Sequence, residues 1–363
     1  MGGYLREGEP RDALAPRDSL FNREQMGSLR RALATVFAAR RGAVAILSVA
    51  TAVVSLPATA SGDNIFVANA GASTVGEYTT SGTTVNASLI SGLDGPGAIA
   101  VSGSNLLVAS FSLTVPNWVV GEYSTSGATL DATLVSGLPY PTQIGAIAVS
   151  GSTLFVSNVY DPANDWEVGE YTITGAMVNA SLLTTGTNRV LGMAVSGSNL
   201  LVANFDRDTI GEYTSSGATV NASLITGLSG PVGIAVSGSI MFVLNEGIFF
   251  SGNPGCIGSI GEYTTSGATV NASLVTGLCS PVGIAVSGSN LFVTSSTSTQ
   301  SNGTIGEYTT SGAVVNASLV TGLSRPWGIA VAPVPEPSTA LLLSAGIVGL
   351  TARRHRARGV SPG

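Results

Sequence analysis

The chain has 363 residues, a formal net charge of −6 and a single histidine, and all fifteen of its basic residues are arginine. Between residues 61 and 337 only three arginines face sixteen acidic residues, a net charge of −13. This balance disfavours nucleic-acid binding, in which phosphate contacts dominate the affinity, and it disfavours docking on anionic lipid.

Residues 1–60 are predicted to be an N-terminal extension followed by a signal peptide. Residues 1–25 are charged and without pattern, and Met26 is the candidate for the true start. Four arginines then precede an apolar run at 43–56, and Ala58-Thr59-Ala60 offers a small-x-small cleavage site. The run is shorter than the roughly 20 residues that span a bilayer comfortably, which favours export over the alternative of an uncleaved anchor.

One pattern then repeats six times between Gly76 and Ile329. In the clearest unit, short strands are expected at 233–236, 240–244, 260–264 and 268–275. A period of about 40–50 residues with four strands per unit is typical of a propeller blade. The sequence therefore predicts an all-β propeller of four-stranded blades over residues 61–332. The triplet Gly-Glu-Tyr marks the units and begins at Gly76, Gly121, Gly169, Gly211, Gly261 and Gly306.

The two ends of this region predict how the ring closes. It opens on a segment of second-strand type at 64–68 and finishes on a segment of first-strand type at 327–331. Pairing these two segments in one blade removes the free edges that an open sheet would expose. The N- and C-terminal strands should therefore share a blade, and the propeller should have six blades.

The first strand of a unit has the sequence motif Pro-x-Gly-Ile-Ala-Val, and the second has Leu-Phe-Val-Ala-Asn. This wording resembles the NHL repeat, a propeller-forming family in which the Gly-Ile-Ala-Val strand lies innermost. The resemblance implies the fold, but it does not carry over a metal-based or charge-based role, because two acidic positions of the family differ here. The acid that often ends the first strand is serine, and the acid after the second strand is Asn69, Asn158, Asn204 or Asn245.

Successive strands alternate in direction, so the connections after the second and fourth strands should share one face. The connection after the second strand varies most in length, and variable loops on a rigid scaffold usually carry binding. Its aromatic residues are candidates for stacking on sugar rings or for docking another protein. The alternative is that they pack their own loops. These residues are Phe111, Trp118, Tyr160, Trp166, Phe205, Phe249 and Phe250. Alanine at Trp118 and Trp166 is expected to weaken binding while leaving thermal unfolding nearly unchanged.

Acidic residues allow two further interpretations. The glutamate of each Gly-Glu-Tyr triplet belongs either to a ring of carboxylates or to one structural hydrogen bond made six times, and the repetition favours the hydrogen bond. Two neighbouring loops also gather oxygen ligands of the kind that Ca²⁺ prefers, although their spacing matches no defined calcium loop. These weak calcium candidates are Asp161, Asp165, Glu167, Asp206 and Asp208. No cofactor is expected.

The chain has only two cysteines, Cys256 and Cys279. One lies in the long connection after a second strand, and the other follows the fourth strand of the same blade. Because both connections should lie on one face, the pair is predicted to form a disulfide in an oxidising compartment.

Residues 333–363 form a tripartite tail. The Pro335-Glu336-Pro337 motif leads into an apolar stretch at 341–350, and an arginine cluster closes the chain. This order resembles the PEP-CTERM sorting signal of Gram-negative bacteria. The resemblance implies processing by an exosortase-type enzyme, transient anchoring in the inner membrane through the apolar helix, and delivery to the cell surface or beyond. Positive residues resist translocation, which suits a stop-transfer role. The arginines are Arg353, Arg354, Arg356 and Arg358.

Two functions from different classes remain open. The first is a non-enzymatic surface or matrix protein that binds polysaccharide or a protein partner through its variable loops. The second is a metal-dependent hydrolase of the lactonase or esterase type on the same propeller. The one histidine, His355, lies in the tail, so residues 61–337 contain no Ser–His or Cys–His pair. This lack of catalytic partners favours the first.

Overall fold

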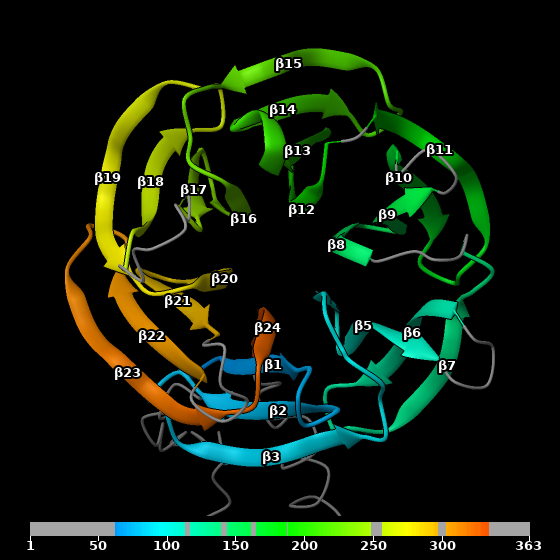
Figure 1. Cartoon of the computed structure of the whole chain (residues 1–363). Helices are drawn as coiled ribbons and strands as arrows, with labels where there is room; N and C mark the ends of the chain where they lie inside the picture. The colour runs from blue at the N-terminus through cyan, green and yellow to red at the C-terminus, as the bar shows by residue number, and fades with distance from the viewer. Residues whose placement is uncertain are drawn as a thin grey trace, which may run out of the picture. The chain divides into compact units, whose positions relative to one another are not determined.

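In a computed structural model, the described residues are 62–112, 117–138, 144–160, 165–186, 188–247, 256–296 and 303–333. They form six antiparallel four-stranded sheets arranged around a central axis (Figure 1). The predicted all-β, six-bladed propeller is confirmed. Within this part of the chain, no helix has both the length and the apolar character needed to cross a bilayer. The predicted signal peptide and C-terminal helix lie outside the described residues.

Each blade runs outward from its first strand to its fourth. The closing blade has β24 (Pro326–Ala332), β1 (Asn64–Asn69), β2 (Thr74–Thr79) and β3 (Thr84–Ser91). The second blade has β4 (Ile99–Ser102), β5 (Asn105–Ser112), β6 (Asn117–Ser124) and β7 (Thr129–Val135). The third has β8 (Ile144–Ser150), β9 (Thr153–Tyr160), β10 (Asp165–Thr172) and β11 (Met177–Gly186).

The other three blades follow in chain order. The fourth has β12 (Val190–Ser196), β13 (Asn199–Asn204), β14 (Thr209–Thr214) and β15 (Thr219–Ile225), with a 3₁₀ turn η1 (Phe205–Arg207) after β13. The fifth has β16 (Pro231–Ser237), β17 (Ile240–Asn245), β18 (Gly258–Thr264) and β19 (Thr269–Leu278). The sixth has β20 (Pro281–Ser287), β21 (Asn290–Ser295), β22 (Gly303–Thr309) and β23 (Val314–Leu323).

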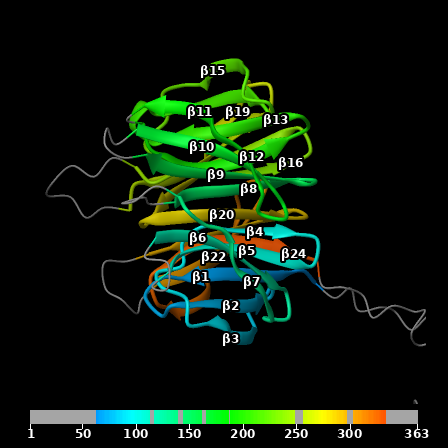
Figure 2. The same ribbon diagram turned by 90° about the vertical axis from the view of Figure 1, so that its right-hand side faces the viewer.

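The ring closes as the sequence predicts. Strand β1 pairs antiparallel with β24, and Ile65 lies opposite Val331. The N-terminal and C-terminal strands of the propeller therefore belong to one sheet, and each of the six blades has four strands. Figure 2 shows the ring from the side, with the inner strands running between its two faces.

The core lies between neighbouring blades. The second strand of each blade is the most buried, and Phe66, Phe155, Phe242 and Phe292 are among its fully buried side chains. The outermost strands differ, because their first five residues are all exposed, as in β3 and β19. Burial on both faces explains the apolar wording of the inner strands, and exposure explains the Thr, Asn and Ser of the outer strands.

The glycine of the Pro-x-Gly-Ile-Ala-Val wording permits close approach of adjacent blades. A Cβ atom on Gly192 of β12 would lie 2.8 Å from the Cα atom of Gly233 on β16. Real side chains do not tolerate that separation. The first strands can therefore crowd around the axis only where this position stays glycine.

The Gly-Glu-Tyr triplet has a structural explanation in each of its three residues. A Cβ atom on Gly76 would lie 2.6 Å from the hydroxyl of Tyr78, so the tyrosine ring occupies the space that glycine leaves. The amide of Asn64 donates a hydrogen bond of 2.5 Å to Glu77. The predicted structural hydrogen bond is confirmed in four blades, where the pairs are Asn64–Glu77, Asn105–Glu122, Asn199–Glu212 and Asn290–Glu307. In the other two blades Thr153 and Ile240 replace the asparagine.

Candidate functional site

The connections after the second and fourth strands lie together, on what we call the loop face. Backbone hydrogen bonds join them: Ala70 N–H donates to the Arg325 carbonyl at 3.1 Å, and Phe205 N–H donates to the Arg189 carbonyl at 2.9 Å. The turns after the first and third strands meet on the opposite side, the turn face, where Thr125 N–H donates to the Ser104 carbonyl at 2.9 Å. The two faces deduced from strand direction are therefore present.

Two of the aromatic candidates pack on each other. The rings of Phe111 and Trp118 are 6.5 Å apart between centroids and meet edge to face at 78°. Trp118 is half-buried and packs against the apolar cluster between the second and third blades. This pair fits the loop-packing interpretation.

Trp166 is a core residue as well as a loop-face residue. It lies in β10, is 5% exposed, and belongs to the apolar cluster between the third and fourth blades. The expectation that alanine here would leave unfolding unchanged does not fit this burial, because an emptied aromatic site costs about 3–5 kcal/mol. Phe205 is half-buried beneath Arg189. Phe249, Phe250 and the side chain of Tyr160 lie outside the described residues.

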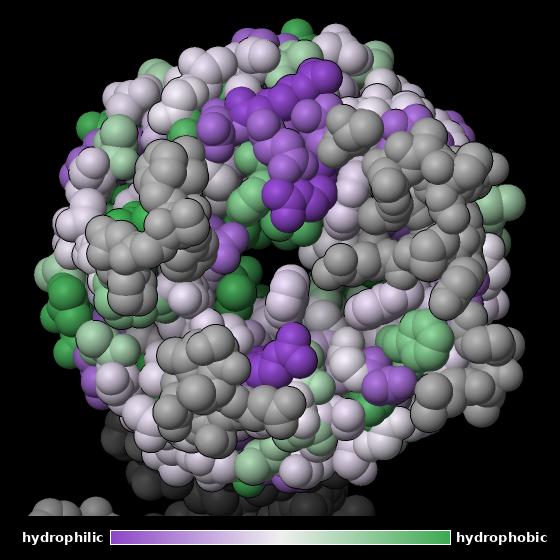
Figure 3. All heavy atoms as spheres, in the orientation of Figure 1, coloured by the Kyte–Doolittle hydropathy of each residue, from purple (hydrophilic) through white to green (hydrophobic). Residues whose placement is uncertain are grey.

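A cavity of about 440 Å³ opens on the loop face at the mouth of the central channel. Figure 3 shows the hollow at the centre of this face, with hydrophilic side chains gathered on opposite sides of its rim. Its polar walls include Arg189, Glu246 and Arg325, and its apolar walls include Trp166 and Trp327. A cavity of this size with a few convergent polar groups has the form of a ligand site.

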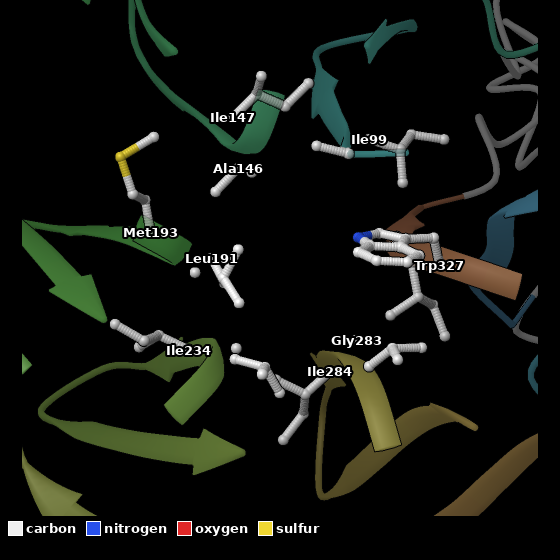
Figure 4. A pocket seen from close by; sticks show the side chains of 17 residues that line it. Ile99, Ala146, Ile147, Leu191, Met193, Ile234, Gly283, Ile284 and Trp327 are labelled. Carbon is white, nitrogen blue, oxygen red and sulfur yellow. The ribbon is translucent and has the colours of Figure 1, made fainter. Parts of the chain in front are cut away.

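Below the mouth the channel is lined by the first strands of all six blades. Figure 4 shows Ile99, Ile147, Ile234 and Ile284 around it, and the indole of Trp327 reaching in from β24. Trp327 lines both the channel and the cavity above it. The side chains at the cavity floor are therefore apolar, and the charged side chains lie at its rim.

Arg189 is held in one orientation by two neighbours. Its guanidinium forms a two-pronged pair with the carboxylate of Asp206, with a shortest separation of 2.6 Å. Its central carbon lies 4.2 Å from the centroid of the Phe205 ring. The hydrogen bond from Arg189 lowers the pKa of Asp206, so this carboxylate stays ionised well into acid. Part of the positive charge of Arg189 is thus already compensated.

Arg325 differs in having no such partner. Its side chain is exposed, and its guanidinium makes no hydrogen bond or ion pair with any residue in the described part of the chain. Its backbone has a φ of 47°, in the left-handed region that non-glycine residues rarely adopt. The cavity rim therefore carries an arginine side chain without an ion-pair partner in the described part of the chain. Its backbone conformation is one that non-glycine residues rarely adopt.

Glu246 is the acidic member of the rim. Burial raises the pKa of Glu246, while the charge of Arg189 acts in the opposite direction. The carboxyl is half-buried, and its backbone N–H donates to the Gly230 carbonyl at 2.9 Å. Glu246 thus loses its charge at a higher pH than an ordinary exposed glutamate.

The described calcium candidates are engaged in other contacts or lie apart. Asp206 binds Arg189, Asp208 accepts a 2.7 Å hydrogen bond from the Gly230 N–H, and Glu167 accepts one from Ser181. Within the described ranges no three acidic, histidine or cysteine side chains gather in a way that could hold a metal ion. Asp161 lies outside the described residues, and the side chain of Asp165 makes no hydrogen bond within the described part of the chain.

A disulfide joins Cys256 to Cys279 across 23 residues of sequence. Cys256 begins the described chain after the long connection of the fifth blade, and Cys279 follows β19. The bridge therefore ties that connection to the end of its own blade, next to the cavity rim at Ser280.

The aromatic-loop prediction missed the residues that dominate the cavity. Arg189 and Arg325 directly precede first strands and Trp327 lies within one, whereas the predicted aromatic residues lie in or beside the connections after the second strands. One signal was available in the sequence. Residues 61–337 contain only three arginines, Arg189, Arg207 and Arg325, and all three lie on the loop face.

The sorting motif at the C-terminus is also recognised by comparison with known families. Residues 333–357 match the PEP-CTERM protein-sorting motif. The motif residues Pro335, Glu336, Pro337, Arg353, Arg354 and Arg356 lie in that match, and Arg358 follows it directly. No curated protein is similar to this sequence.

Two solved structures are similar to this chain over most of its length. One chain in a crystal structure of a nidogen/laminin complex is 15% identical, has a TM-score of 0.57, and aligns over 75% of this chain and 98% of its own length. A functionally unknown protein from Desulfotomaculum acetoxidans is 16% identical over 76% of this chain and 88% of its own, with a TM-score of 0.49. The first likeness supports the fold alone. The chain is a six-bladed β-propeller with a PEP-CTERM sorting motif, which implies a protein processed by an exosortase and exported to the surface of a bacterium.

Proposed function

We propose that this protein is a non-enzymatic binding scaffold of the surface or extracellular matrix of a Gram-negative bacterium, and that it binds polysaccharide. The cavity at the channel mouth carries this proposal. It combines an indole that reaches toward the axis, Trp327, with hydrogen-bonding and charged groups at the rim. Flat aromatic surfaces beside polar groups suit sugar rings, which present apolar faces and hydroxyl edges.

A concave site favours a glycan over a protein partner. Protein interfaces of standard size bury about 800 Å² on each side and are organised around clusters of anchors. Here the aromatic and cationic groups converge in a hollow that accommodates a narrow chain. Delivery proceeds through a cleaved signal peptide and a transient inner-membrane stage before exosortase processing.

The test uses mature protein purified from the producing cell. Its binding to that cell's own exopolysaccharide is measured by co-sedimentation and calorimetry, with Trp327→Phe and Trp327→Ala as variants. We expect binding that alanine weakens and phenylalanine largely retains. Absence of binding, together with bound metal at one equivalent and turnover of a small panel of lactones and esters, would instead establish the hydrolase.

A further inference from the structure

Both arginines of the cavity occupy the same position of the repeat. The first-strand segment of each blade opens on a proline, except in the fourth blade, where it opens on Val190. The position in question is the residue directly before it. In the five described cases this position holds Gly95, Arg189, Gly230, Ser280 and Arg325. The turn does not require arginine, since Gly95, Gly230 and Ser280 make it with φ of 53°, 61° and 46°.

Arg325 is therefore unexplained by the turn. A side chain in the left-handed region is disfavoured, and glycine would relieve the strain at no cost to the turn. Strain that persists where an unstrained residue would serve points to a role for the side chain. The Arg325 guanidinium has no partner among the described residues, so that role is not a contact with this part of the propeller.

The two arginines stand across the channel from each other. Arg189 precedes β12 and Arg325 precedes β24, and these strands lie three blades apart in a ring of six (Figure 1). Both line the same cavity, so their guanidinium groups approach its opening from opposite sides. Trp327 follows Arg325 by two residues and lines the same cavity.

Charge makes this cavity the exception on the molecule. Residues 61–337 carry a net charge of −13, which repels anions. At the cavity rim Arg189 is paired with Asp206, and Glu246 is the acidic lining residue. Arg325 is the rim cation that has no carboxylate partner in the described part of the chain. The remaining arginine, Arg207, does not line the cavity. An anionic ligand is therefore expected to bind in this cavity and not elsewhere on the described surface. A neutral ligand would not require a cation at the rim.

We propose that the cavity recognises a sugar carboxylate, with Arg325 as the group that binds it, Arg189 as the oriented second cation, and Trp327 as the surface on which the sugar ring stacks. The polysaccharide is then acidic and built from uronate residues. This inference rests on the proposed function. Arginine suits the task because its planar fork matches a carboxylate in two-pronged geometry.

The test compares two forms of one polymer. Mature protein purified from the producing cell is titrated with polygalacturonate and with alginate. It is also titrated with the methyl-esterified, uncharged forms of the same polymers. We expect the acidic forms to bind about tenfold more tightly or better, as for hydrogen bonds to charged groups. Equal affinity for both forms overturns this inference and leaves the proposed function intact. Binding to neither form overturns this inference, and the co-sedimentation with the cell's own exopolysaccharide then decides the proposed function separately.

Matched variants assign the effect to the cavity. Arg325→Gln should lose most of the preference for the acidic form, while Arg207→Gln removes the same charge from the same face and should bind like wild type. Thermal unfolding of each variant checks that the fold persists. Equal losses in the two variants would show a general charge effect of the face, and the site at Arg325 would be rejected.

Discussion

The hydroxyl of Ser157 donates a hydrogen bond of 2.9 Å to the carbonyl of Val190 in the next blade. The same oxygen accepts a 2.7 Å bond from the Ala146 N–H, and the side chain is fully buried. Thr294 makes the corresponding bond to the Trp327 carbonyl at 2.7 Å. Buried hydroxyls thus connect first strands across two of the blade boundaries.

Ser157→Ala is expected to destabilise the propeller by about 1–3 kcal/mol, because it leaves a buried N–H and a buried carbonyl without partners. Denaturant unfolding followed by tryptophan fluorescence measures the change. Ser223→Ala, at an exposed position of β15, is the matched control and should have little effect. Equal stability of the two variants would show that water replaces the lost hydroxyl.

Arg325→Gly is expected to stabilise the protein by up to about 1 kcal/mol, because glycine relieves the left-handed backbone at this turn. The same change should abolish the preference for acidic glycans. The two readouts are differential scanning calorimetry and titration with polygalacturonate. A loss of stability would mean that the side chain supports the fold.

Binding of an acidic glycan is expected to strengthen as the pH falls from 7 toward about 5, before the carboxylates of the glycan are protonated. Burial raises the pKa of Glu246, so its repulsive charge is lost first, while Asp206 stays ionised because the hydrogen bond from Arg189 lowers its pKa. Glu246→Gln should bind more tightly at pH 7 and lack this increase. A wild-type affinity independent of pH in that range would contradict the assignment.

Thiol titration of the unreduced, unfolded protein should find no free cysteine. Replacing Cys256 and Cys279 by serine is expected to destabilise by about 3 kcal/mol in the chain-entropy account, given the 23-residue separation. Unfolding of wild type with and without reductant checks the value. Two titrated thiols would show that the bridge does not form in the cell.

The sorting motif predicts a shortened C-terminus in the mature protein. Protein from the surface fraction should lack His355 and the arginine cluster that ends at Arg358, and its intact mass measures this loss. The cytoplasmic precursor serves as the control, since it retains both. Surface protein with Arg358 attached would contradict processing at this motif.

The fold could be predicted because the sequence repeats the same four-strand pattern six times. Triplet spacing gave the number of blades, and the strand types at 64–68 and 327–331 gave the pairing that β1 and β24 make. Trp166 shows the limit of that approach. The sequence predicts a loop at this position, but β10 begins at Asp165, so the side chain of Trp166 points into the core.

The candidate site was less accessible from sequence. Arg189 and Arg325 are 136 positions apart in sequence, and only closure of the ring sets them on opposite sides of one cavity. Aligning the repeats would have shown that both occupy one turn position. The lack of a partner for Arg325 and the raised pKa of Glu246 depend on packing, which no local pattern records.

The pairing of β24 with β1 also decides how the molecule is held. The first strand of each blade runs from the loop face to the turn face, so the chain leaves the propeller at Ala332 on the turn face. The matched motif begins at the next residue, Pro333. The sorting motif therefore follows the propeller directly on the turn face, and the cavity opens on the opposite face, so a partner engaged at Pro333 leaves the cavity mouth uncovered.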